Sequence, residues 1–327
     1  MLTLILLACK PTPDPAPATP VDTDVLDTGE PLDTDVPEDT DPPELFRPEQ
    51  LDCPSLPPLP TTFTAIPQLG PHEDFGFDAV GRLVGTDGSG NLRGETRDGT
   101  VSLIAPNVGS ARGTRVLPDG AVAVALPDEA SVTVVMPDGQ RSVLASVSGA
   151  NGIGVDLFGN VWAATSTGQV VRMTRDGDVL LAAQVQASLD GIAFSPDYRR
   201  LYFNSEFGDV RVLDIDDNGD PVGAPSLFVH VPISLAAILD GMTTDMCGNL
   251  YVVRMDGRVY RYLPDGTMDG WIPFGAQGGF QVIPAANFGS GVGGFERDRL
   301  YAMNFLGGVY EAEIGIEGRW EPHYAQP

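Results

Sequence analysis

One pattern recurs along most of this 327-residue chain: two short apolar runs separated by a tight turn and followed by a hairpin. Its clearest copy, residues 190–215, reads DGIAFSPDYRRLYFNSEFGDVRVLDI. In this copy Ser-Pro-Asp-Tyr supplies the turn between two strands rich in β-branched and aromatic residues. Aligned in the same register, six copies begin at Glu73, Arg112, Asn151, Asp190, Asp240 and Asn287.

The spacing of these copies predicts the fold. Successive copies start 39, 39, 39, 50 and 47 residues apart. A period near 40 residues, built from short strands and Gly, Asp and Pro turns, is typical of the four-stranded blades of a β-propeller. Six copies therefore predict an all-β, six-bladed β-propeller over residues 61–327. The 39 Gly and 29 Pro residues agree with a turn-rich β protein.

Two details of this propeller follow from the same reading. Residues 61–66, TTFTAI, alternate in polarity ahead of the first copy. We expect them to complete the blade that contains residues 300–314, because such pairing closes the ring without an exposed sheet edge. The two longer spacings place extra residues at 214–238 and 271–286, where we expect loops.

The acidity of the chain is uneven. The net charge of −26 argues against a nucleic-acid partner, since phosphates require a basic surface. Residues 11–52 alone contain 13 Asp or Glu and a single Arg. This Pro-, Thr- and Asp-rich stretch cannot bury enough apolar area to offset the entropy of ordering. We therefore predict a disordered acidic linker over residues 9–60, as a solvated spacer rather than a loose calcium-binding segment.

The N-terminus carries a short apolar run. Residues 2–8 are too few to span a bilayer, and the run ends in LLAC, with Cys9 last. This ending resembles the signal of bacterial lipoproteins. The resemblance implies that residues 1–8 are a signal peptide and that Cys9 carries a lipid anchor in the bacterial cell envelope. In such proteins a residue like Lys10 after the cysteine goes with the outer membrane, so we expect a periplasmic or surface location.

Cysteines and histidines outside this signal are few. If Cys9 is lipidated, Cys53 and Cys247 remain as an even pair in an oxidising compartment. They either form a disulfide that ties the end of the linker to the fifth blade or remain two free thiols. No Cys or His spacing suggests a zinc site. His230 and His323 lie in no motif, and we expect both at the surface.

The first residues of the six copies are the candidate site. In a propeller the innermost strand of each blade lines a central channel, so equivalent residues at the strand starts converge at one face. Glu73, Asp190 and Asp240 would then repel one another, and oxygen ligands of this kind suit calcium or magnesium. Two simpler interpretations stay open. Each Asx-Gly pair could only mark a turn, and Arg112 could neutralise the carboxylates without a metal.

The blade openings also resemble a known family. Three of them read NGIGVD from Asn151, DGIAFSPD from Asp190 and DGMTTD from Asp240. They resemble the openings of the six-bladed propellers of the senescence marker protein, gluconolactonase and luciferin-regenerating enzyme family, and the resemblance covers about residues 70–315. The first opening, EDFGFD from Glu73, is similar to that of paraoxonases and strictosidine synthase-like proteins.

The resemblance implies a set of site residues. It assigns a divalent cation, often calcium, to Glu73, Asn151, Asp190 and Asp240, with Asn151 also facing the substrate and Asp240 acting as general base. Asp190 departs from the family, which has Asn there. A second departure is Gly149, because sugar lactonases carry an Arg at that position. Gluconolactone itself is therefore not the expected substrate.

These observations lead to two functional hypotheses. The first is an anchored hydrolase of a lactone or ester. In it a calcium ion polarises the substrate carbonyl, and Asp240 or a metal-bound water supplies the general base or the nucleophile. Arg112 and Asn287 would contact the small-molecule substrate, and we expect a monomer. The second is a non-catalytic propeller that binds a glycan, a peptide or a small ligand, since the fold hosts both kinds of protein.

Overall fold

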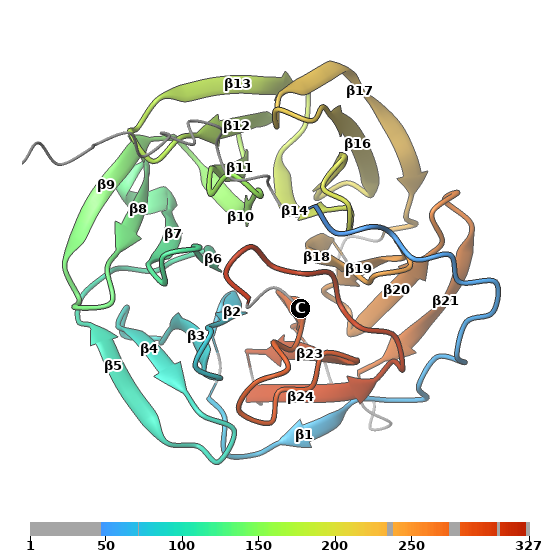
Figure 1. Ribbon diagram of the computed structural model, residues 1–327, viewed down its shortest axis with the longest axis horizontal. Coiled ribbons are helices and arrows are strands. Elements are labelled where there is room, and N and C mark those ends of the chain that lie inside the picture. The colour runs from blue at the N-terminus through green and yellow to red at the C-terminus, as the bar shows by residue number, and fades with distance from the viewer. Residues whose placement is uncertain (1–46, 71, 234–237, 275–281, 306–307, 325–327) are drawn as a thin grey trace, which may run out of the picture. The chain divides into compact units, whose positions relative to one another are not determined.

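The computed structural model describes residues 47–70, 72–233, 238–274, 282–305 and 308–324. The predicted signal peptide, Cys9 and most of the acidic linker lie outside the described residues. Six four-stranded antiparallel sheets follow one another around a central axis (Figure 1). The predicted all-β, six-bladed propeller is confirmed. Among the described residues no helix is long and apolar enough to cross a membrane.

Each blade has four strands in sequence order, except the last. Blade one contains β2 (Phe75–Phe77), β3 (Leu83–Thr86), β4 (Leu92–Glu95) and β5 (Val101–Ala105). Blade two contains β6 (Gly113–Val116), β7 (Val122–Leu126), β8 (Ser131–Val135) and β9 (Arg141–Ser146), with the 3-10 turn η1 (Pro127–Glu129). Blade three contains β10 (Ala150–Val155), β11 (Val161–Thr165), β12 (Gln169–Met173) and β13 (Val179–Gln184).

The second half of the ring is built in the same way. Blade four contains β14 (Leu189–Phe194), β15 (Arg200–Ser205), β16 (Asp209–Ile215) and β17 (Pro221–His230). Blade five contains β18 (Leu239–Thr244), β19 (Leu250–Arg254), β20 (Arg258–Tyr262) and β21 (Met268–Pro273). Blade six contains β22 (Ala286–Phe288), β23 (Arg299–Asn304), β24 (Gly308–Glu313) and β1 (Thr64–Ile66).

Blade six closes the ring as predicted. Its outer strand β1 comes from the other end of the sequence and pairs with β24, with Thr64 opposite Glu311 and Ile66 opposite Val309. Phe63 and Ile66 are each only 4% exposed, so the closing strand is also held by apolar packing. Closure removes a free edge from the sheet that would otherwise end the ring.

Aspartates organise the turns that join inner strands to second strands. Asp156, at the end of β10, accepts hydrogen bonds from the main-chain N–H groups of Phe158 and Asn160, both at 2.9 Å. Gly159 in the same turn has a φ of 79°, which a residue with a side chain adopts only at a cost. The same arrangement recurs at Asp245. The carboxylates of these turns therefore act within the scaffold, on the face where the inner strands end.

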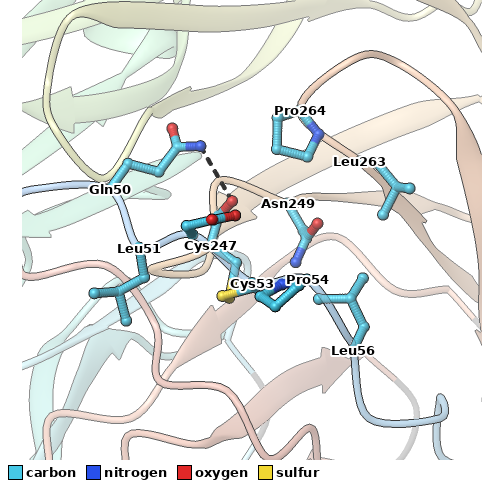
Figure 2. A pocket seen from close by; sticks show the side chains of 10 residues that line it. Gln50, Leu51, Cys53, Pro54, Leu56, Cys247, Asn249, Leu263 and Pro264 are labelled. Carbon is cyan, nitrogen blue, oxygen red and sulfur yellow. Dashed lines mark hydrogen bonds between the residues drawn. A yellow bond between two sulfur atoms is a disulfide. The ribbon is translucent and has the colours of Figure 1, made fainter.

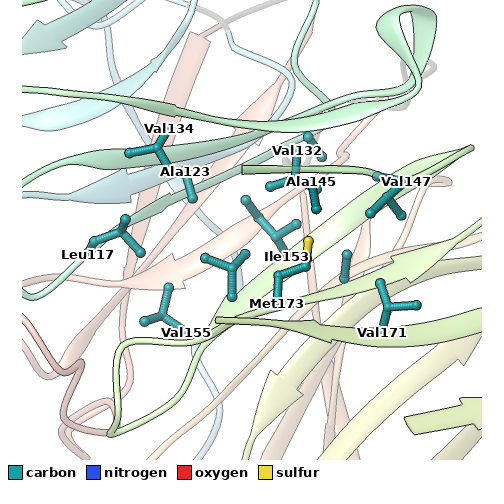
Figure 3. Close-up of a cluster of buried hydrophobic side chains, with 14 of the residues drawn as sticks. Leu117, Ala123, Val132, Val134, Ala145, Val147, Ile153, Val155, Val171 and Met173 are labelled. Atoms are coloured by element: carbon teal, nitrogen blue, oxygen red, sulfur yellow. The ribbon is translucent and has the colours of Figure 1, made fainter. Parts of the chain in front are cut away.

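Apolar side chains fill the space between neighbouring blades. Figure 3 shows the cluster between blades two and three, where Leu117, Ala123 and Val132 face Ile153 and Met173. Comparable clusters lie at the other interfaces between blades. Burial of this apolar area is the main favourable contribution to folding. It also fixes the angle at which each inner strand meets the axis.

The expectation of a loop over residues 214–238 was wrong for most of that segment. Residues 221–230 form β17, a strand of ten residues that pairs with β16 through two register shifts. Extra residues are accommodated by lengthening the outer hairpin of blade four, because its backbone groups find partners in β16. Asp216 caps the connecting turn by accepting the N–H groups of Asn218 and Asp220.

The C-terminal segment, residues 315–324, crosses the face where the inner strands end, which we call the lower face (Figure 1). Its main chain pairs with the turn after β18: Met246 N–H donates to Glu317 O at 2.8 Å, and Arg319 N–H donates to Thr244 O at 3.1 Å. The His323 ring bonds the carbonyl of Phe77. The expectation that His323 lies at the surface is correct only in part: the residue is partly exposed, but its ring is fixed to blade one, and desolvation lowers its pKa.

Candidate active site

The six predicted residues lie at or just before the starts of the inner strands, on the face we call the upper face. Four are within inner strands: Asn151 in β10, Asp190 in β14, Asp240 in β18 and Asn287 in β22. Glu73 lies two residues before Phe75, the first residue of β2, and Arg112 lies immediately before Gly113, the first residue of β6.

The Asx-Gly pairs form β-bulges. The pairing of each inner strand shifts register at Asn151-Gly152, at Asp190-Gly191 and at Asp240-Gly241. A bulge places an extra residue in one strand and redirects its side chain, and bulges are common beside active sites. The interpretation of these pairs as simple turns before the strands is therefore wrong.

The glycine after each polar residue allows neighbouring inner strands to come close. A Cβ added to Gly152 would collide with the carbonyl oxygen of Asp190, and one added to Gly191 would collide with that of Asp240. Gly113 meets the carbonyl of Asn151 in the same way. The glycines thus bring the polar residues of successive blades together around the axis.

Asp190 and Asp240 form the centre of the site. Their carboxyl groups are hydrogen-bonded to each other, and Asp190 is only 7% exposed. Burial raises the pKa of Asp190 to about 7. Burial, the negative charge of Asp190 and that of Glu73 together raise the pKa of Asp240 well above its usual range. The pair therefore retains a proton near neutral pH, with Asp240 as the protonated donor.

Glu73 and Arg112 complete this group at the upper face. Burial raises the pKa of Glu73, while the nearby guanidinium of Arg112 lowers it and the carboxylate of Asp74 raises it further. Arg112 also lowers the pKa of Asp190. The side chain of Arg112 is exposed to solvent, so it can meet both the carboxylates and an incoming ligand.

Two residues of the site were missed by sequence reasoning. Asp74 and Arg115 form a buried ion pair at 2.7 Å, and Thr114 N–H also donates to Asp74 at 2.9 Å. Both line the same small cavity as Arg112, Asp190 and Asp240. The only sequence signal was position, because Asp74 follows Glu73 and Arg115 lies three residues after Arg112.

The central cavity is small. Its volume is about 10 Å³, which is about the space of one water molecule or ion. A second cavity of about 220 Å³ is lined by Glu73, Thr86, Ser110 and Phe305 among others. Glu73 precedes Asp74, which lines the central cavity, so the second cavity lies at the same end of blade one and is large enough for part of a small molecule.

The two asparagines have different positions. Asn287 donates from Nδ2 to the carbonyl of Phe75 at 2.7 Å and so connects the inner strands of blades six and one. Asn151 is buried on β10, and the residue that follows it, Gly152, lines the central cavity. The structure thus brings Glu73, Arg112, Asp190 and Asp240 together and gives the amide nitrogen of Asn287 a bond between blades.

The donor types fit a hard cation. Carboxyl oxygens are the preferred ligands of calcium and magnesium. A carboxyl pair that holds a proton can release that proton and bind a cation in its place. Within the described ranges, however, no group of three or more His, Cys, Asp or Glu side chains is arranged to hold a metal ion. Cation binding at this site would thus require a rearrangement of its carboxylates.

Comparison with known proteins agrees with this architecture. The model of the SMP-30/Gluconolactonase/LRE-like region matches residues 181–282, which include Asp190 and Asp240. The resemblance noted in the blade openings is confirmed for this part of the chain. Its boundaries enclose nearly all of blades four and five.

One curated relative matches part of this chain at the level of sequence. The pentonolactonase XacC of Haloferax volcanii is 31% identical over 111 residues, which cover 33% of this chain. The matched segment spans 38% of the relative's own length.

Solved structures share the fold over most of the propeller. A gluconolactonase of Xanthomonas campestris has a TM-score of 0.60 at 19% identity, covering 81% of this chain and 97% of that one. Regucalcin of Agrobacterium tumefaciens, a calcium-binding protein, has a TM-score of 0.63 at 18% identity, covering 82% and 95%. At these identities the likeness shows that the proteins share the propeller fold.

Proposed function

We propose that the protein is a hydrolase of a lactone or ester that works at the upper face with a divalent cation, calcium, bound by Glu73, Asn151, Asp190 and Asp240. The observation that carries the proposal is the coupled carboxyl pair of Asp190, which is buried, and Asp240, which is partly exposed in the same cavity. Two carboxyl groups withdrawn from water and bonded to each other are costly to ionise, so they need either a proton or a cation. The lactonases among the similar proteins support the reaction class.

The residues of the site have distinct roles in this proposal. A bound cation would supply charge stabilisation for a polarised carbonyl. Asp240 gives up its proton when the cation binds and then accepts one from the attacking water. Arg112, exposed at the mouth, donates hydrogen bonds to the carbonyl oxygen as negative charge develops there. The cavity beside Glu73 holds the remainder of the small substrate.

A lactone panel with chelation tests the proposal. Purified protein is assayed against pentonolactones, gluconolactone and simple aryl esters, with calcium and with EGTA. We expect hydrolysis that EGTA and Asp240→Asn abolish, while Asp128→Asn, an exposed carboxylate in η1, leaves it unchanged. Thermal stabilisation by calcium with no turnover of any ester or lactone would instead identify a binding protein and contradict the hydrolase.

We also propose that the chain is displayed from a membrane by a lipid on Cys9. The support is the LLAC ending of the apolar run and the acidic, Pro-rich stretch that follows it. Expression of the full chain in a Gram-negative host, followed by fractionation and mass spectrometry of the N-terminal peptide, tests this. Recovery of Cys9→Ser in the membrane fraction to the same extent as the original chain would contradict it.

A further inference from the structure

The segment that leads into the propeller, residues 47–60, is attached to the lower face by a disulfide. We call this segment the strap. Cys53 is bonded to Cys247, which lies in the turn after β18, so the open choice between a disulfide and two free thiols is settled in favour of the bond. Beside the bond, Leu51 N–H donates to Met246 O at 2.8 Å and Gln50 Nε2 donates to Cys247 O at 3.2 Å (Figure 2).

The strap runs directly into the strand that closes the ring. After Cys53 the strap is held by Arg261, whose Nη2 donates to Pro57 O at 3.0 Å, and by Leu59, which packs beside the core of blades five and six. Only a few residues further on, Thr64–Ile66 forms β1 and pairs with β24. A three-residue edge strand is marginal by itself, and its pairing depends on how closely it is held to its partner.

This order of attachments has a mechanical consequence. The Cys53–Cys247 bond lies between residue 47 and β1 along the chain, so a pulling force on the chain ahead of residue 47 acts on this bond before it acts on β1. The bond transfers it to the turn after β18, where Met246 also receives the C-terminal segment through its N–H bond to Glu317 O. Without the bond, the part of the strap before Pro57 is held by hydrogen bonds alone, with Leu51 54% exposed, and the apolar packing of Leu59 and Phe63 is left to hold the segment next to β1.

A cavity gives solvent access to the bond. It has a volume of about 440 Å³ and is lined by both cysteines, Gln50, Leu51, Leu263 and Pro264 (Figure 2). Cys247 is only 5% exposed, whereas Cys53 is partly exposed. A small thiol that enters the cavity therefore reaches the sulfur of Cys53 more readily than that of Cys247.

We propose that the Cys53–Cys247 bond is a redox-sensitive latch on ring closure, opened by a dithiol that enters this cavity. A thiolate of the dithiol attacks Sγ of Cys53, the S–S bond breaks, and Cys247 leaves as a thiolate. The second thiol of the reagent then displaces Cys53 from the mixed disulfide. The protein gains two electrons and two protons, and the dithiol becomes a cyclic disulfide. The strap is released and the β1–β24 pairing loosens.

Native-state hydrogen exchange of the full chain tests the latch. The protein is compared before and after treatment with dithiothreitol, with iodoacetamide used to trap the thiols and mass spectrometry to confirm which cysteines react. We expect peptides that contain β1 and β24 to exchange roughly tenfold faster or more after reduction, while β10 and β11 of blade three keep their protection. Trapping at partial reduction should give chains in which Cys53 carries the dithiol and Cys247, the leaving thiolate, carries the alkyl label.

Matched variants separate the latch from general stabilisation. Cys53→Ser with Cys247→Ser should reproduce the fast exchange of β1 without reagent, whereas Arg47→Ala, which removes the bonds of the strap to Asp197 O and Asp217 but leaves the disulfide, should leave β1 protected. Unchanged exchange of β1 after complete reduction of the original chain would overturn the proposal. Equal acceleration in all six blades would overturn it too, because the bond would then stabilise the fold as a whole.

Discussion

Replacing Asp190 by Asn should remove most of the pH dependence of stability that the channel creates. Burial raises the pKa of Asp190 to about 7 from 3.8, the value expected in the unfolded chain. A carboxyl whose folded pKa is raised contributes stability that is complete below the unfolded value and is lost as the pH rises through the folded value. At about 1.36 kcal/mol per pKa unit, the difference corresponds to roughly 4 kcal/mol in total.

Most of this loss falls in an accessible pH range. Between pH 5 and the folded pKa near 7 the chain should lose roughly 3 kcal/mol of unfolding free energy through this group. Asp190→Asn keeps the size of the side chain and can still donate to Asp240, but it has no proton to lose. The variant should therefore be the more stable protein at pH 8 in the absence of divalent cations.

Urea denaturation at pH 5, 6, 7 and 8 in the presence of EGTA measures this difference. Unfolding free energies of the original chain, Asp190→Asn and the control Asp128→Asn are compared at each pH. We expect the original chain and the control to lose stability together toward pH 8 and Asp190→Asn to lose much less. Parallel pH profiles for all three proteins would refute the reasoning, because they would show that the channel carboxyls are not coupled to folding.

Three further predictions rest on other features of the ring. Calcium should raise the melting temperature at pH 7.5, EGTA should reverse the rise, and Asp240→Asn should lose it, which differential scanning fluorimetry measures directly. Gly191→Ala should lower the unfolding free energy by about 1–3 kcal/mol because the new Cβ collides with the carbonyl of Asp240, whereas Gly88→Ala, with open space around its Cβ, should be nearly neutral in the same melts. Trp162→Ala should cost about 3–5 kcal/mol in urea titrations, because it empties a fully buried site and removes the 2.9 Å bond to Asp156.

Much of the fold could be read from the sequence. The recurrence of the blade openings every 39 to 50 residues predicted the number of blades, because each blade is one local unit of about 40 residues with its own turns. The alternating residues 61–66 predicted the closing strand, because an open ring would leave a sheet edge unpaired. The pairing of Cys53 with Cys247 was one of two open choices, because connectivity depends on how close two distant turns lie.

The character of the site could not be read in this way. Sequence position placed Asp190 and Asp240 near the axis, but their raised pKa values depend on burial and on each other's charge across two blades. The bond of Asn287 to Phe75 O and the ion pair of Asp74 with Arg115 both join residues of different blades. The tilt of neighbouring strands and their bulges determine which polar groups come into contact. No local sequence pattern specifies this tilt.

The sequence by itself determined the architecture of this protein and the short set of residues from which a site can be built. Only the tertiary structure decided which of them share a proton, which hold blades together and where His323 and the strap are attached. The physical reason is one of range. Turns and strands are selected by interactions within a few residues, whereas desolvation and charge coupling act between groups that only folding brings together.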